Sequence, residues 1–251
     1  KGDSLVKNIK LIIEYDGTNY YGWQKQNDKV TIQGTLEEAV RNLTKEENEI
    51  LGCSRTDSGV HARGFVATFK TESTVPPHKF REAINYRLPD DIVILSSEEV
   101  SEDFHPRYLA KGKTYEYTIY NNLVPTALNR LYSYHYKYSL DIEVMKNACH
   151  FFKGTHDFKA FRSEGSSVKT TVRTIYDVNI KIDGDFIKIS VSGDGFLYNM
   201  VRIIVGTLIN VGRGKITPED IEKIILGRDR KAEGDCVPAK GLKLTAVYYK
   251  K

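Results

Sequence analysis

The sequence predicts an α+β protein built from two similar lobes over a shared sheet. Three observations support this prediction: strand-like and helix-like apolar periodicities alternate along the chain, both halves run in the order strand, helix, strands, helix, strand, and no short-period repeat is present. The length of 251 residues allows one large domain or two smaller ones. With 40% hydrophobic and 28% charged residues, the composition is that of a globular chain, not of a disordered or fibrous one.

In the first half, strands alternate with helices. Asn8–Tyr15 has the composition of a strand and is followed by the turn pair Asp16-Gly17. Thr31–Lys45 places apolar residues at helical spacing, with Thr31 as the expected N-cap. The other elements expected here are a short apolar segment at Leu51–Arg55, a strand at Phe65–Phe69, a helix at Pro76–Tyr86 that ends before Pro89, and a further strand at Asp91–Leu95.

The second half begins near His105-Pro106, so we expect lobes at 8–104 and 105–250. Lys113–Tyr120 alternates and thereby places Tyr115 and Tyr117 on one face of a strand. Phe196–Val211 is nearly all apolar, which predicts a buried helix. The remaining expected elements are a helix at Asp141–Phe152, a hairpin at Val172–Val191 that turns at residues 183–185, a helix at Pro218–Leu226 that stops at Gly227, and a closing strand at Leu242–Tyr249.

Charge is distributed unevenly along the chain. Lys and Arg number 37 against 33 Asp and Glu, for a net charge of +4. Residues 151–182 hold six basic and three acidic residues, and residues 196–215 hold three basic residues and no acidic one. Residues 216–235 are mildly acidic. A one-sided basic face would suit a polyanion, although a solvated helix surface would explain each patch singly.

Several functional classes lack support in the sequence. No apolar run is long enough to span a membrane, and no secretory signal precedes the first strand, so we expect a cytoplasmic protein. The three cysteines form no CxxC pair and the histidines are scattered, which predicts no metal site. Gly112-Lys113-Thr114 is not a phosphate loop, because Arg107 occupies the position where that motif requires glycine. No nucleotide cofactor is therefore expected.

Two polar groups lie in unusual settings. Arg55–His61, a run with the sequence RTDSGVH, lies between two predicted strands, and its Asp-Ser-Gly triplet alone is typical of a turn. Arg202 lies in the apolar run FLYNMVRIIVG, where an unpaired guanidinium would be very costly. Arg202 therefore reaches the surface or pairs with a carboxylate, and Asp57 is the natural candidate, because only a few acidic residues lie in loops that could approach it. An Asp beside an Arg stays ionised, as a nucleophile or base requires. A purely structural ion pair is the alternative.

Tyrosine is abundant, with 16 Tyr against one Trp. Tyr115 and Tyr117 on one face of a strand, flanked by Lys111 and Lys113, would form a stacking platform beside phosphate contacts in a nucleic-acid complex. Core packing explains the same alternation equally well.

Five sequence motifs follow one another in a fixed order between about Ile9 and Tyr249. They are Tyr15–Gln26, Arg55–Ala62, Phe104–Arg107 leading to Lys113–Tyr117, Gly154–Phe158 and Phe196–Arg202, with Gly241-Leu242 near the end. In these motifs the chain resembles the TruA-type tRNA pseudouridine synthases. The resemblance implies the pseudouridine synthase fold, in which two similar lobes share a mixed, mostly antiparallel sheet with helices on its outer faces and a central RNA cleft.

The resemblance also implies roles for individual residues. Asp57 would be the essential catalytic aspartate, paired with Arg202, and Tyr115 would stack on the target uracil. Arg55 would hold the RNA, and Leu244 would line the pocket. The remaining residues expected to contact RNA are Arg107, Lys111, Lys113 and His61.

The implied reaction breaks the N1–C1′ bond of a uridine in the anticodon stem-loop of tRNA, turns the base and rejoins it through C5. As an isomerisation it consumes no cofactor, and the family acts as a homodimer. The uridine must leave its stem to reach Asp57, so base flipping is expected. Two alternatives remain open: a catalytically silent RNA-binding protein of the same fold, and a carboxylate-dependent nucleoside hydrolase that releases free uracil.

Overall fold

The computed structural model describes residues 6–165, 168–227 and 234–250. The chain forms two compact units, one made of the residues before Gly112 together with those after Leu242, the other of Gly112–Leu242. The sequence places the boundary between residues 104 and 105 and the closing strand in the second lobe. In the structure that strand groups with the first unit, because it pairs there with a strand far away in the sequence.

The first unit contains a mixed, mostly antiparallel sheet with the strand order β4-β1-β3-β10. β1 (Lys7–Tyr15) lies antiparallel to β3 (His61–Thr71) and to β4 (Ile92–Val100), whereas β10 (Leu242–Tyr249) lies parallel to β3. The short β2 (Leu51–Gly52) also pairs with β3. β3 is thus the central strand of this unit.

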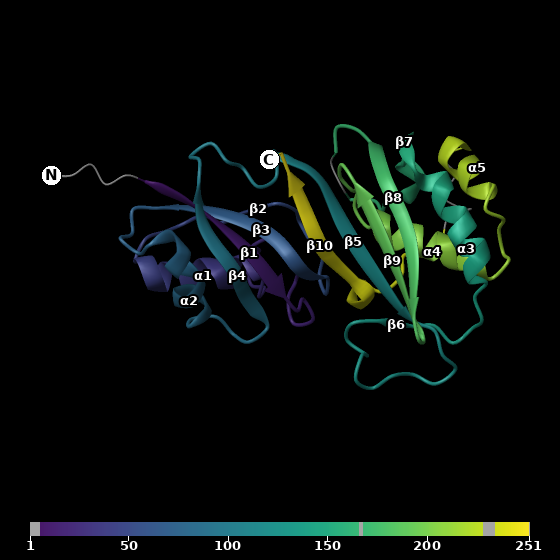
Figure 1. The fold of residues 1–251 in the computed structure, drawn as a ribbon, viewed down its shortest axis with the longest axis horizontal. Helices are drawn as coiled ribbons and strands as arrows, with labels where there is room; N and C mark the ends of the chain where they lie inside the picture. The colour runs from purple at the N-terminus through teal and green to yellow at the C-terminus, as the bar shows by residue number, and fades with distance from the viewer. Residues whose placement is uncertain (1–5, 166–167, 228–233, 251) are drawn as a thin grey trace. The chain divides into compact units, whose positions relative to one another are not determined.

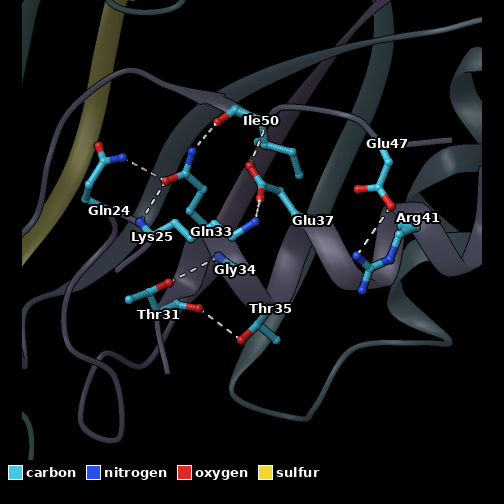
Figure 2. Close-up of polar contacts among 10 residues, drawn as sticks. All are labelled: Gln24, Lys25, Thr31, Gln33, Gly34, Thr35, Glu37, Arg41, Glu47 and Ile50. Atoms are coloured by element: carbon cyan, nitrogen blue, oxygen red, sulfur yellow. Dashed lines mark hydrogen bonds and ion pairs between the residues drawn. The ribbon is translucent and has the colours of Figure 1, made fainter. Parts of the chain in front are cut away.

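The described residues of the first unit include the helices α1 and α2 (Figure 1). α1 (Ile32–Thr44) begins at the predicted N-cap, where Thr31 Oγ1 accepts a hydrogen bond from Gly34 N at 3.2 Å (Figure 2). α2 (Phe80–Asn85) follows a 3₁₀ turn at Pro77–Lys79 and packs against β4. The apolar residues of α1 are buried on one side, as its periodicity predicts.

The second unit contains the antiparallel strand order β5-β9-β8-β7. These strands are β5 (Ala110–Tyr120), β9 (Phe186–Gly193), β8 (Val172–Asp183) and β7 (Gly154–Asp157), and the short β6 (Tyr134–His135) pairs with β5. The predicted hairpin between β8 and β9 is confirmed, and its turn uses Gly184 at a φ of +58°. Each unit therefore combines a sheet with helices, which confirms the α+β prediction.

The helices of the second unit gather beside its sheet (Figure 1). α3 (Ile142–Ala148) has Asp141 as its N-cap and continues into a 3₁₀ turn, and α4 (Met200–Gly212) is buried on nearly all sides. α5 (Asp220–Gly227) follows, and further 3₁₀ turns lie at Lys159–Phe161 and Ala239–Gly241. Within the described ranges, no helix is long and apolar enough to cross a membrane.

Some boundaries differ from those predicted. The apolar helix begins at Met200 and not at Phe196, because Asn199 has a φ of 60° and ends the preceding loop in the left-handed region, which Asn tolerates. The strand predicted to start at Phe65 starts at His61, where β10 pairs with it. Pairing between distant segments decided this second boundary, and local periodicity does not report such pairing.

Candidate active site

Asp57 lies in a tight turn within the aspartate loop, by which we mean Arg55–His61. The backbone N–H of Val60 donates to Asp57 O at 3.1 Å, and Gly59 has a φ of +79°. A positive φ at the third position is the requirement of a type II turn, which glycine meets without strain. The Asp-Ser-Gly triplet is therefore a turn, as predicted, and the Asp57 side chain at its start is half-buried.

The loop is held by the opening segment, which comprises Tyr15–Gln26. Gly59 N and Ser58 Oγ both donate to Tyr20 O, each at 3.3 Å. On the other side of Asp57, Trp23 N donates to Thr56 O at 3.0 Å, and the hydroxyls of Tyr15 and Thr56 lie 2.7 Å apart in a buried hydrogen bond. Both neighbours of the aspartate are thus hydrogen-bonded to the same segment.

Two glycines allow the opening segment to approach the loop this closely. A Cβ on Gly17 would lie 2.0 Å from Val60 O, and a Cβ on Gly22 would lie 2.5 Å from Thr56 O. Gly22 also has a φ of +80°, which disfavours any other residue. The sequence identifies Gly17 as part of a turn pair, but the contact of both glycines with the loop is visible only in the structure.

The aspartate loop ends at His61, where β3 begins, and Leu244 of β10 lies beside this start of β3. His61 is buried, its Nδ1 accepts a hydrogen bond from Gly17 N at 2.9 Å, and the same nitrogen lies 3.1 Å from an oxygen of Asp16. Leu244 is fully buried on β10 and pairs in register with Ala62. The structure therefore brings Leu244 beside the aspartate loop and gives His61 a structural contact.

The far end of the opening segment is anchored by a buried glutamine on α1 (Figure 2). Gln33 Oε1 accepts hydrogen bonds from Lys25 N at 2.8 Å and from Gln24 Nε2 at 3.2 Å, and Gln33 Nε2 donates to Ile50 O at 3.0 Å. Because Trp23 lies next to these residues and bonds Thr56 O, the anchoring by Gln33 extends to the aspartate loop. The sequence pattern does not identify Gln33, since one buried polar residue leaves no periodic signal.

Tyr115 and Tyr117 point to the buried face of β5, as the alternation predicts. Tyr117 is fully buried and donates to Pro238 O at 2.7 Å, which identifies it as a core residue. Its burial raises the pKa of its hydroxyl above the usual range, and the nearby Arg202 guanidinium opposes that rise. Tyr115 is 7% exposed and meets Phe196 edge to face, with ring centroids 5.3 Å apart. Tyr117 therefore does not belong to the predicted stacking platform, and for Tyr115 the stacking role stays a prediction.

Arg202 lies in the first turn of α4 and is half-buried. Its Nε donates to Val237 O at 2.7 Å and its Nη1 donates to Asn199 Oδ1 at 2.9 Å. Asn199 in turn donates from Nδ2 to Ser163 Oγ at 3.0 Å. These bonds fix the guanidinium within the second unit.

The other cations expected to contact RNA lie near the surface. Arg55, Arg107 and Lys111 are exposed, and Lys113, opposite Gly193 in the β5–β9 register, is half-buried. The predicted residues thus fall into two groups: Arg55, Asp57, His61, Arg107, Lys111 and Leu244 belong to the first unit, and Lys113, Tyr115 and Arg202 to the second. Within the described ranges, no group of three His, Cys, Asp or Glu residues could hold a metal ion.

Comparison with known proteins assigns this chain to a family. The family model described as tRNA pseudouridine synthase matches residues 11–109 and 148–250, which include the opening segment, the aspartate loop and Arg202. The chain belongs to the tRNA pseudouridine synthase family.

Relatives of known name agree with this assignment. The chain is 60% identical over 244 residues to tRNA pseudouridine synthase A 2 from Clostridium perfringens, with 97% of this chain and 100% of the relative covered. It is 56% identical to tRNA pseudouridine synthase A from Acetivibrio thermocellus, with the same coverage. Among solved structures, a chain of the Cbf5-Nop10-Gar1 complex aligns with a TM-score of 0.37 and 13% identity over 94% of this chain and 57% of that one. A likeness at that level carries no functional argument.

Proposed function

We propose that this protein converts uridine to pseudouridine in the anticodon stem-loop of tRNA, with Asp57 as the catalytic carboxylate. The conversion of uridine to pseudouridine in tRNA follows from the family, whose members at 60% and 56% identity are tRNA pseudouridine synthases, that is, isomerases that use no cofactor. The observation that supports the role of Asp57 is the aspartate loop, in which a half-buried carboxylate is presented by a turn with hydrogen bonds on both sides.

The reaction requires little beyond one ionised carboxylate. The N1–C1′ bond breaks, the C5–C1′ bond forms, C5 loses its proton and N1 gains one, so the atoms of the RNA balance. Asp57 has three chemically open roles: attack on the sugar, attack on the base, or removal of a sugar proton. In this proposal Arg202 would keep Asp57 ionised, and Leu244, in register with Ala62, would line the uridine pocket.

Tyr115 and the surface cations serve substrate binding in this proposal. A uridine that leaves its stem loses its stacking energy, and the ring of Tyr115 would replace part of it. Arg55, Arg107, Lys111 and Lys113 would neutralise phosphates, which makes binding salt-dependent. His61 would support the RNA-binding surface by holding the turn at Gly17, since its ring is buried.

The proposal extends to assembly and location. Homodimer formation is part of it on the resemblance to the family, and a cytoplasmic location is part of it as the sequence analysis expects. Sedimentation at twice the mass of one chain would support the dimer, and sedimentation as a single chain would contradict it.

The decisive experiment replaces the carboxylate. Asp57→Asn keeps the shape of the side chain and removes its charge, so we expect pseudouridine formation in tRNA to be abolished while tRNA binding persists. The assay maps pseudouridine in tRNA and measures free uracil. The matched control is Asp90→Asn, an exposed aspartate between α2 and β4, for which we expect wild-type activity.

Each other outcome has a defined meaning. Full activity of Asp57→Asn would remove Asp57 from the mechanism. Free uracil released by the wild-type protein would favour the hydrolase. Binding without any modification by the wild-type protein would favour the silent RNA-binding protein.

A further inference from the structure

We propose that Tyr15 and Thr56 are positioning residues whose hydroxyl pair sets the backbone of the aspartate loop and thereby the direction of the Asp57 carboxylate. The inference rests on the proposed catalytic role of Asp57. Neither residue carries a charge, and both are buried, Tyr15 at 2% and Thr56 at 6% exposure.

Thr56 is held at two atoms. Its carbonyl oxygen accepts from Trp23 N at 3.0 Å, and its Oγ1 bonds the hydroxyl of Tyr15 at 2.7 Å. Because a peptide group is planar, fixing the carbonyl of Thr56 also fixes the N–H of Asp57. The bond from Thr56 Oγ1 to Tyr15 prevents rotation of the peptide plane between Thr56 and Asp57. The two bonds together therefore fix the position of the Asp57 backbone, from which its side chain projects.

Tyr15 is itself a rigid support. It is the last residue of β1 and pairs with Ala62 across a register shift after Ile13. Its ring packs against Phe65 of β3, with centroids 5.7 Å apart. The hydroxyl that meets Thr56 is therefore carried by the central strands of the first unit and not by another loop.

Net stability does not explain a hydroxyl pair at this buried place. Burying two hydroxyls costs free energy that their mutual hydrogen bond roughly offsets, and an apolar pair of the same shape, such as Phe with Val, can be equally stable. What the apolar pair lacks is direction, since a hydrogen bond fixes an angle and an apolar contact does not. The pair therefore contributes geometry to the loop.

The test separates geometry from stability. We would prepare Tyr15→Phe, Thr56→Val, the double variant and Thr56→Ser, and measure kcat and KM with tRNA well below the melting temperature, together with the melting temperature itself. Thr71→Val is the matched control: Thr71 is buried at the opposite end of β3 and donates to Glu46 Oε2 at 2.7 Å.

For the single variants we expect kcat to fall about 10- to 100-fold, since a displacement of about 1 Å can cost that much, while KM stays within about twofold. The double variant should regain the melting temperature, because no hydroxyl is left unpaired, and should still have the low kcat. Thr56→Ser should retain kcat, and Thr71→Val should lower the melting temperature without lowering kcat.

A wild-type kcat in the double variant, or a kcat that recovers together with the melting temperature, would overturn the inference. Asp57→Asn is assayed in parallel. If it is inactive while the double variant is fully active, the positioning role alone fails. If Asp57→Asn is active, the proposed catalytic role fails and the positioning role fails with it.

Discussion

The two units present their candidate site residues by different means. In the first unit, Asp57 lies in irregular backbone whose shape depends on Gly59, on the opening segment and on buried hydrogen bonds. In the second unit, Tyr115 and Arg202 project from a strand and a helix whose backbone bonds are regular. Changes to neighbouring backbone should therefore damage the first group most, whereas the second group should be sensitive mainly to changes of its own side chains.

The largest effect is expected at Gly22. In Gly22→Ala the new Cβ would meet Thr56 O at 2.5 Å, in a residue with a φ of +80°. We expect the free energy of unfolding to fall by about 3 kcal/mol and pseudouridine formation to be lost, because strain and steric overlap act together next to Asp57. Urea unfolding and the tRNA assay measure the two effects.

Gly184→Ala is the matched control for this change. Gly184 also has a positive φ, +58°, but a Cβ there would meet nothing within 4 Å. Its cost should be about 1 kcal/mol, the backbone penalty alone, with activity unchanged. Equal effects of the two substitutions would contradict the idea that the opening segment shapes the aspartate loop.

Arg202→Ala is expected to have the next largest effect. It removes the hydrogen bonds of a cation to Val237 and Asn199 and should lower the free energy of unfolding by about 2 kcal/mol, with slower turnover. Those bonds are lost whether or not Arg202 also pairs with Asp57, so a lower melting temperature alone does not demonstrate the pair.

A double-mutant cycle isolates the pairing. Arg202→Ala is compared in the wild-type and in the Asp57→Asn background by chemical unfolding. If the two charges pair, the effects should couple by about 1 kcal/mol. Additive effects would mean that Arg202 is only a structural residue of the second unit.

The remaining effect, on substrate binding, is expected at Tyr115. Tyr115→Leu removes the aromatic face and should lower kcat/KM about 5- to 150-fold, the range of one lost base-stacking contact. Tyr115→Phe keeps the ring and its edge-to-face contact with Phe196, so it should stay within about threefold of wild type. Steady-state kinetics on tRNA distinguish the two, and a Phe variant as poor as the Leu variant would assign the role to the hydroxyl.

Local sequence signals predicted much of the regular structure. The N-cap at Thr31, the alternation of β5 and the hairpin at Gly184 were predicted correctly, because capping, pleat and turn chemistry act between residues close in the chain. The start of α4 was predicted four residues early, since the apolar run continues through a loop that Asn199 ends.

By itself, the sequence determined the α+β class, the order of the motifs and the turn that carries Asp57, since each depends on composition, periodicity or short spacing. Only the tertiary structure decided that β10 lies parallel to β3, with Leu244 beside Ala62, and that Tyr15, Gly22 and Trp23 hold Thr56. The reason is physical: these contacts join residues more than thirty positions apart, and such contacts form only when the whole unit packs and its buried polar groups find partners.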